Sequence, residues 1–186
     1  MYLCKKGKLK MNFIQKYKIN NQLNRFVKRG RKDNLQVCSL EKAEKICIFH
    51  TFQSQEVLEQ IIKSANLLKK KHLVIYCFLP HNTENSTSNQ ETVAFISKKD
   101  FNFTGNLKKE KLLLLQAQQF DLLIDLDKET TLFSLYLTRT IQAKFRIGRC
   151  EKSKQYFNLT LCSSDENMKI ETYFQSIDQY TKKIIS

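Results

Sequence analysis

Short apolar runs alternate along this chain with stretches that repeat apolar residues at helical spacing. The runs at residues 46–49, 73–79 and 120–126 are dominated by apolar side chains, which is typical of strands buried on both faces. Between the first two, residues 57–68 place apolar side chains on one face of a helix. Strands and helices that alternate with short connections form a mostly parallel sheet with helices on both sides. The sequence therefore predicts an α/β fold, a three-layer Rossmann-like domain with five to six strands.

The same two patterns predict the remaining elements. Further strands are expected at 93–96, 143–147 and 156–161, and further helices at 109–119, 131–141 and 167–184. Ser54 and Thr130 or Thr131 precede helical stretches and are residue types that cap helix N-termini. The apolar face of the C-terminal helix is expected to hold Tyr173, Ile177, Tyr180 and Ile184. The polar residues 82–90 are expected to form a loop.

Positive charge is concentrated at the N-terminal end. Eleven of the 32 lysines and arginines lie in the first 32 residues, which contain no acidic residue, so the rest of the chain carries only +3 of the net charge of +14. A helix is expected over 11–28, with an apolar stripe at Ile19, Leu23, Phe26 and Val27, and the sequence at 29–33 ends it. We therefore predict a basic arm over residues 1–34 and a single Rossmann-like domain over residues 35–186 that folds without the arm.

Cationic arms usually meet phosphate groups. The residues expected to bind a polyanion are Lys16, Lys18, Arg25, Lys28, Arg29, Arg31 and Lys32. Phe13, Tyr17 and Phe26 are expected to stack on bases or to pack against the domain. RNA or the ribosome is the favoured partner, and an anionic membrane surface is an alternative. The simplest structural interpretation is a lysine-rich helix that packs on the domain and leaves its outer face solvated.

A second group of candidate residues follows the predicted strands. His50, His81, Asp125 and Asp127 stand at or just beyond the ends of three strands, where open α/β sheets bind ligands. Imidazoles and carboxylates that meet there would suit acid–base chemistry, a metal, or a nucleotide-sugar ligand in a degenerate glycosyltransferase-like domain. The alternative is that these side chains are solvated or cap the neighbouring backbone. We expect that structural role, and no catalytic residue, at this edge.

Motifs for phosphate-bearing cofactors are missing. Residues 50–54 read His-Thr-Phe-Gln-Ser, without the glycines that let a backbone approach a pyrophosphate, and no Walker motif occurs. The six cysteines form no C-x-x-C pair and have no histidine at metal-ligand spacing, which indicates free thiols in a reducing compartment. Because neither a signal peptide nor a run of about 20 apolar residues is found, we expect a cytoplasmic, non-catalytic protein without metal or cofactor.

Two segments resemble known families. FDLLIDL at 120–126, followed by a helix and AKFRIGR at 143–149, is similar to the later half of the N-terminal domain of lipopolysaccharide heptosyltransferases. The chain lacks that family's Gly-Asp loop after the first strand and is too short for its sugar-nucleotide domain, so the resemblance implies the fold and not glycosyl transfer. The whole chain resembles uncharacterised small Bacteroidota proteins with these segments, a basic N-terminal helix and a turn like SKKDFNFTG at 97–105. That resemblance implies a cytoplasmic Rossmann-like protein and no particular activity.

Overall fold

A computed structural model of the protein describes residues 11–30, 37–70, 72–80, 92–149, 151–163, 165 and 168–185. Its centre is a six-stranded parallel sheet with the strand order β3-β2-β1-β4-β5-β6. The strands are β1 (Lys45–Thr51), β2 (His72–Leu79), β3 (Val93–Ser97), β4 (Gln119–Asp125), β5 (Gln142–Gly148) and β6 (Leu159–Thr160). This is a doubly wound order of the Rossmann type, and it confirms the predicted fold class.

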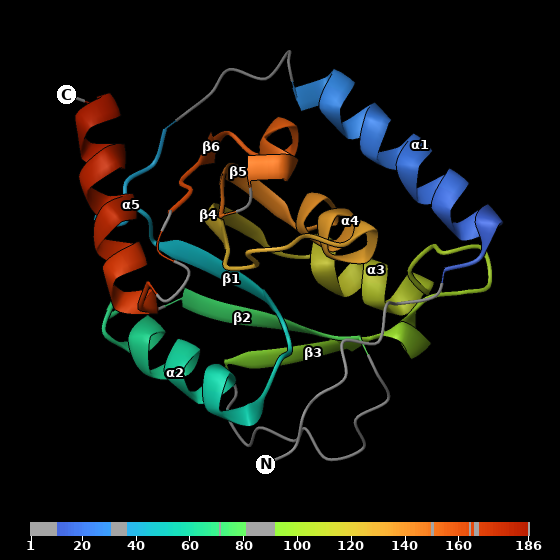
Figure 1. Cartoon of the computed structure of the whole chain (residues 1–186), viewed down its shortest axis with the longest axis horizontal. Coiled ribbons are helices and arrows are strands. Elements are labelled where there is room, and N and C mark those ends of the chain that lie inside the picture. The colour runs from blue at the N-terminus through green and yellow to red at the C-terminus, as the bar shows by residue number, and fades with distance from the viewer. Residues whose placement is uncertain are drawn as a thin grey trace.

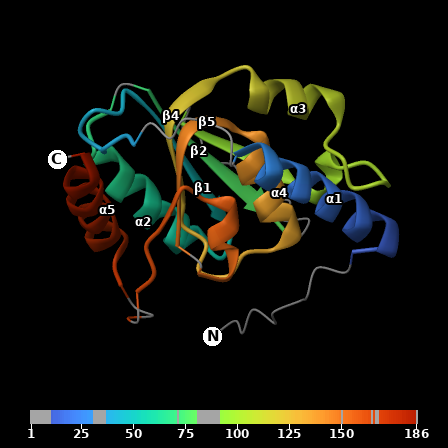
Figure 2. The ribbon, with the colours of Figure 1, turned by 90° about the horizontal axis from the view of Figure 1, so that it is seen from above.

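Helices cover both faces of the sheet (Figure 1, Figure 2). They are α1 (Phe13–Gly30), α2 (Gln55–Asn66), α3 (Lys109–Gln116), α4 (Leu132–Thr140) and α5 (Ile170–Ile185), with short 3₁₀ turns η1 (Lys98–Asp100) and η2 (Glu151–Tyr156). Helices α2 and α5 pack on one face of the sheet. Helices α3 and α4 pack on the other face, and α1 lies against α4. The result is the predicted three-layer arrangement.

The central strands are apolar on both sides because both faces of the sheet are covered. In β1, Ile46 and Ile48 join the core beneath α2 and α5. Cys47 and Phe49, which alternate with them, join the core beneath α4. All four side chains are fully buried, which explains why the sequence of β1 is continuously apolar rather than alternating.

Side-chain caps begin α2 and α4 at predicted positions. Oγ of Ser54 accepts the backbone N–H of Val57 at 3.3 Å, and Oγ1 of Thr131 accepts that of Ser134 at 3.1 Å. Asn12 caps α1 in the same way, accepting a backbone N–H of the first turn at 2.7 Å. Each cap satisfies a donor that the helix leaves unpaired, and such caps contribute about 1 kcal/mol to stability.

Three predicted elements differ from the structure. The helix expected at 109–119 ends at Gln116, and Gln119 already belongs to β4. Residues 156–158 are not strand, because η2 extends to Tyr156 and β6 has only two residues, which pair with β5. The residues that α5 buries are Tyr173, Phe174, Ile177 and Thr181, whereas Tyr180 and Ile184 are each 52% exposed. Both sets of α5 residues form a stripe at helical spacing. Periodicity therefore permits either stripe, and the position of the sheet and of α2 selects one of them.

Helix α1 is attached to the domain by one face. Ile19 and Leu23 are fully buried in the core that also contains residues of α4. Phe26 is half-buried, with Cζ of Arg139 5.6 Å from its ring centroid. The predicted boundary at residue 34 and the predicted loop at 82–90 lie outside the described residues. The division into arm and domain therefore stays a prediction, although α1 contributes directly to one of the two cores.

Candidate functional site

The first candidate site lies where the order of the strands reverses. β1 and β4 are neighbours in the sheet, and doubly wound folds bind ligands beyond the carboxyl ends of such a pair. His50 and Thr51 end β1, whereas Asp125 ends β4 and Asp127 follows it; we call these four residues the strand-end cluster. His50, Asp125 and Asp127 are 3%, 0% and 2% exposed. The fourth predicted residue of this edge, His81, lies outside the described residues.

Thr51, Asp125 and Asp127 of the strand-end cluster are joined by hydrogen bonds, whereas the two ring nitrogens of His50 are buried without a hydrogen-bond partner among the described residues. Thr51 donates its backbone N–H to Oδ1 of Asp127 at 2.7 Å and its hydroxyl to Oδ2 of Asp127 at 2.5 Å. The backbone N–H of Asp127 donates to Oδ1 of Asp125 at 2.9 Å. Nδ1 of His50 lies 3.5 Å from Oδ1 of Asp127. These contacts tie the end of β1 to the segment that follows β4.

The Asp127 carboxylate lies where it obstructs the usual ligand of this fold. In Rossmann-type domains the backbone N–H groups after the first strand help to hold phosphates. Here the N–H of Thr51 is already donated to Asp127, and Asp125 adds a second buried carboxylic group nearby. A phosphate would therefore meet an occupied donor and negative charge. The arrangement favours a structural role for the cluster over a nucleotide-sugar site.

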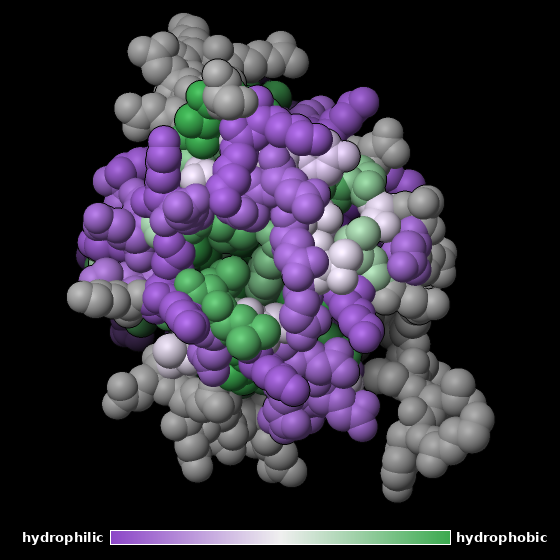
Figure 3. All heavy atoms as spheres, turned by 90° about the vertical axis from the view of Figure 1, so that its left-hand side faces the viewer, coloured by the Kyte–Doolittle hydropathy of each residue, from purple (hydrophilic) through white to green (hydrophobic). Residues whose placement is uncertain are grey.

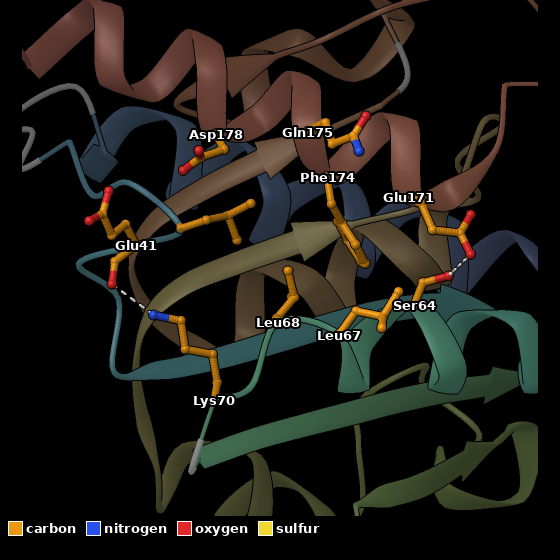
Figure 4. Close-up of a pocket in the computed structure, with 10 residues that line it drawn as sticks. Glu41, Ser64, Leu67, Leu68, Lys70, Glu171, Phe174, Gln175 and Asp178 are labelled. Atoms are coloured by element: carbon orange, nitrogen blue, oxygen red, sulfur yellow. Dashed lines mark hydrogen bonds between the residues drawn. The ribbon is translucent and has the colours of Figure 1, made fainter.

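A groove that the sequence analysis did not predict lies between α2 and α5. Its volume is about 440 Å³. Figure 3 shows apolar side chains gathered on this side of the molecule and bordered by polar ones. Leu67, Leu68 and Phe174 line its apolar part (Figure 4), together with Leu40. Local pattern gave no signal for this groove, because its lining comes from three segments that are distant in sequence.

Several polar side chains around the groove are paired within the molecule. The hydroxyl of Ser64 donates to Oε1 of Glu171 at 2.8 Å (Figure 4). The pKa of Glu171 is lowered by hydrogen bonds from its own backbone N–H and from Ser64. Nζ of Lys182 lies 3.1 Å from a carboxylate oxygen of Glu41 and 2.8 Å from one of Asp178. The groove is therefore lined by apolar side chains, and the polar side chains named here form hydrogen bonds or ion pairs with one another.

The third candidate site is the exposed side of α1. We call its exposed basic, aromatic and aliphatic residues Phe13, Ile14, Lys16, Tyr17, Lys18, Arg25 and Lys28 the outer face of α1. Phe13, Ile14 and Tyr17 are 84%, 46% and 62% exposed. The helix contains no acidic residue, and none of the four ion pairs found among the described residues involves it. Four of the predicted polyanion-binding residues are therefore exposed on a packed helix.

The other predicted members of that group are placed differently. Arg31 and Lys32, together with the side chain of Arg29, lie outside what the structure describes. Phe26, expected to stack or pack, packs: its ring is half-buried and has the Arg139 guanidinium over it. Phe13 and Tyr17 remain as the exposed aromatic residues of the helix.

The turn after η1 helps to position α1. Nε2 of Gln22 donates to Oδ1 of Asn106 at 3.0 Å. Gly105, in the same turn, has a φ of +85° and approaches the helix so closely that an added Cβ would lie 3.2 Å from Cβ of Gln15. A side chain at Gly105 would be strained in that conformation and crowded against α1. Helix α1 is thus held by the turn that contains Gly105 and Asn106, in addition to the core in which Ile19 and Leu23 are buried.

The two fully buried cysteines of the described residues, Cys47 and Cys77, are not placed as reactive thiolates. Cys38, Cys47, Cys77 and Cys162 take part in no disulfide within the described residues. Burial raises the pKa of Cys77 to about 12 and also raises that of Cys47, so both thiols stay protonated at neutral pH. Within the described ranges, no group of three or more His, Cys, Asp or Glu side chains is placed to hold a metal ion.

Two further properties concern the chain as a whole. None of the helices in the described part of the chain combines the length and the apolarity needed to cross a bilayer. No curated protein and no solved structure matches the chain. A protein-family model does match, over residues 11–184, a range in which α1 and the whole sheet are included. The chain therefore belongs to this family, which is described as a family of unknown function, DUF6913.

Proposed function

We propose that the protein binds RNA, including RNA within the ribosome, through the outer face of α1. The observation that carries the proposal is the group of exposed cations on this face, Lys16, Lys18, Arg25 and Lys28. No acidic residue lies on the helix, and no ion pair found among the described residues neutralises these charges. Cations that are not neutralised within the molecule remain available to the phosphates of a polyanion.

The packing of α1 supports this proposal. Burial of Ile19 and Leu23 fixes the inner face of the helix on the domain, and the hydrogen bond between Gln22 and Asn106 holds its side. The cations are therefore presented by a backbone that is already ordered. Binding then costs less conformational entropy than the ordering of a flexible tail would, and the release of counterions from RNA provides a favourable term.

An anionic membrane surface is a less suitable partner for this face. A helix that lies in a lipid interface buries a broad apolar side among the acyl chains. In α1 the fully buried apolar residues Ile19 and Leu23 already face the domain. The exposed apolar residues are confined to the first turns, at Phe13, Ile14 and Tyr17. RNA needs only the cations and gains from isolated exposed rings, so it fits the distribution better.

A binding assay with matched charge variants tests the proposal. Fluorescence anisotropy would follow a labelled single-stranded RNA of about 12 nucleotides, a length within the range that single-strand-binding sites cover. One variant replaces the four outer-face cations by glutamine, at Lys16, Lys18, Arg25 and Lys28. The control replaces four exposed lysines elsewhere, at Lys42, Lys63, Lys169 and Lys183. Both variants lose the same net charge, so a difference between them reports position rather than total charge.

We expect the unmodified protein to bind at low salt, with an affinity that falls as salt rises. Loss of four phosphate contacts should reduce the slope of log K against log salt by about 3 for the outer-face variant. The control should keep its slope. Absence of binding at low salt, or equal loss in the two variants, would contradict the proposal. Binding to anionic vesicles without binding to RNA would contradict it in favour of the membrane.

A further inference from the structure

We infer that the outer face of α1 binds RNA where its bases are unpaired, with Phe13 and Tyr17 as the rings on which the bases stack. This inference rests on the proposed function and adds the structural class of RNA. The observation behind it is the exposure of these two rings, 84% for Phe13 and 62% for Tyr17, on a helix surface whose other exposed residues are cationic or polar apart from Ile14.

The helix separates its aromatic residues according to their surroundings. Phe26 turns toward the domain, where Arg139 covers its ring. Phe13 and Tyr17, four residues apart, emerge from the same side of the helix, with their Cβ atoms about 6 Å apart. Two neighbouring rings that remain in water retain an apolar surface that a flat partner can cover. A nucleobase is such a partner, because every base presents a π-face, and stacking tolerates any sequence.

The positions of the cations indicate how a bound strand would lie along α1. Lys16 and Lys18 flank Tyr17 along the chain, whereas Arg25 and Lys28 lie two to three turns further along the helix. A strand that follows the helix would stack bases on the first turns and place phosphates against the last turns. These contacts are open to loops, bulges and ends of folded RNA, whose bases are splayed out.

A paired helix of RNA cannot use the two rings in this way. Within an A-form duplex the base faces are stacked on each other, and its major groove is too deep and narrow for side chains to read. A duplex would therefore contact only the cations of the outer face. The structure thus predicts that single-stranded RNA binds more tightly than duplex RNA of the same sequence, although the duplex has the higher charge density.

The experiment compares ligands and aromatic variants in the same anisotropy assay. The ligands are a single-stranded RNA of about 12 nucleotides, its duplex with the complementary strand, and single-stranded DNA of the same sequence. The test variant is Phe13→Ala with Tyr17→Ala. The matched control is Tyr180→Ala, which removes a ring that is 52% exposed on α5. Thermal unfolding of each variant verifies that the fold is kept.

The expected result is a loss of at least about tenfold in affinity for single-stranded RNA in the double variant. Its affinity for the duplex and its salt slope should be unchanged, because the cations remain. Tyr180→Ala should bind as the unmodified protein does. Duplex binding as tight as single-strand binding, or an unchanged affinity in the double variant, would overturn the inference. The proposed function would still stand in that case if the charge variants behave as expected. Tighter binding of the DNA strand would overturn the assignment to RNA. No binding of any ligand would contradict the proposed function itself.

Discussion

The strand-end cluster and the outer face of α1 both gather polar side chains, but they use them in opposite ways. In the cluster, Asp127 accepts two hydrogen bonds from Thr51 and lies beside His50, so its charge is used inside the molecule. On the outer face, Lys16, Lys18, Arg25 and Lys28 are exposed and take part in no ion pair found among the described residues. A polar residue in the expected place is therefore weak evidence for a site. An unneutralised charge on a rigid support is stronger evidence.

The largest expected effect concerns the support of the outer face. Leu23→Ala should lower the free energy of unfolding by about 3 kcal/mol, because it leaves a cavity where a fully buried side chain packs. Asn24→Ala, at the next and exposed position, should change it by less than about 0.5 kcal/mol. Urea denaturation measures both. Equal, small effects would mean that α1 is a separable arm, as the sequence-based division at residue 34 implies.

The second effect concerns the strand-end cluster. Asp127→Ala should lower the free energy of unfolding by about 2 kcal/mol, because it removes the acceptor of the backbone N–H and the hydroxyl of Thr51. Asp127→Asn should lower the free energy of unfolding by less, because the amide oxygen still accepts one of these hydrogen bonds. A variant as stable as the unmodified protein would show that the cluster is not a structural tie. The ligand interpretation of this edge would then regain support.

A smaller, pH-dependent effect is expected at the other end of β4. Asp121 accepts hydrogen bonds from Nζ of Lys144 at 2.7 Å and from two backbone N–H groups at 3.0 Å each. The bond from Lys144, with help from the backbone, holds the pKa of Asp121 below its ordinary value of 3.8. A carboxyl group with a lower pKa in the folded state stabilises the protein above that value, and this stabilisation is lost as pH falls below it.

The measurement for Asp121 is stability as a function of pH. Urea denaturation at about pH 5 and at about pH 3 should show a decline on acidification, part of which disappears in Asp121→Asn. The difference should be small, because the pair lies near the surface, where solvent screens charges. An identical decline in the variant would show that other carboxyl groups cause the loss of stability in acid. The pair of Asp121 and Lys144 would then contribute nothing to it.

The smallest expected effect on stability is that of the outer-face cations. Replacement of Lys16, Lys18, Arg25 and Lys28 by glutamine should change the free energy of unfolding by less than about 0.5 kcal/mol, because exposed charges without partners contribute little to folding. Thermal or urea unfolding checks this. A marked loss of stability would show that these cations have structural partners, and the contrast with the strand-end cluster would disappear.

Much of the fold could be predicted because local patterns determine it. The continuous apolar run of β1 reflects burial on both faces, and Ser54 and Thr131 begin their helices as caps, since each needs only the nearest turn of backbone. The stripe of α5 could not be assigned, because Tyr180 and Phe174 both fit helical periodicity. Only the neighbours of a helix decide which of two adjacent stripes is buried.

The candidate sites also differ in whether the sequence or the tertiary structure determined them. That Lys16, Lys18, Arg25 and Lys28 have no acidic partner on their own helix follows from the sequence alone, because the helix contains no acidic residue. The tertiary structure decided the rest. Strand order placed Thr51 against Asp127, 76 positions further along the chain, and joined the two ends of the predicted ligand edge by hydrogen bonds. The approach of α5 to α2 formed a groove that no local pattern indicates. Such contacts depend on which distant segments become neighbours, and short-range periodicity carries no information about that choice.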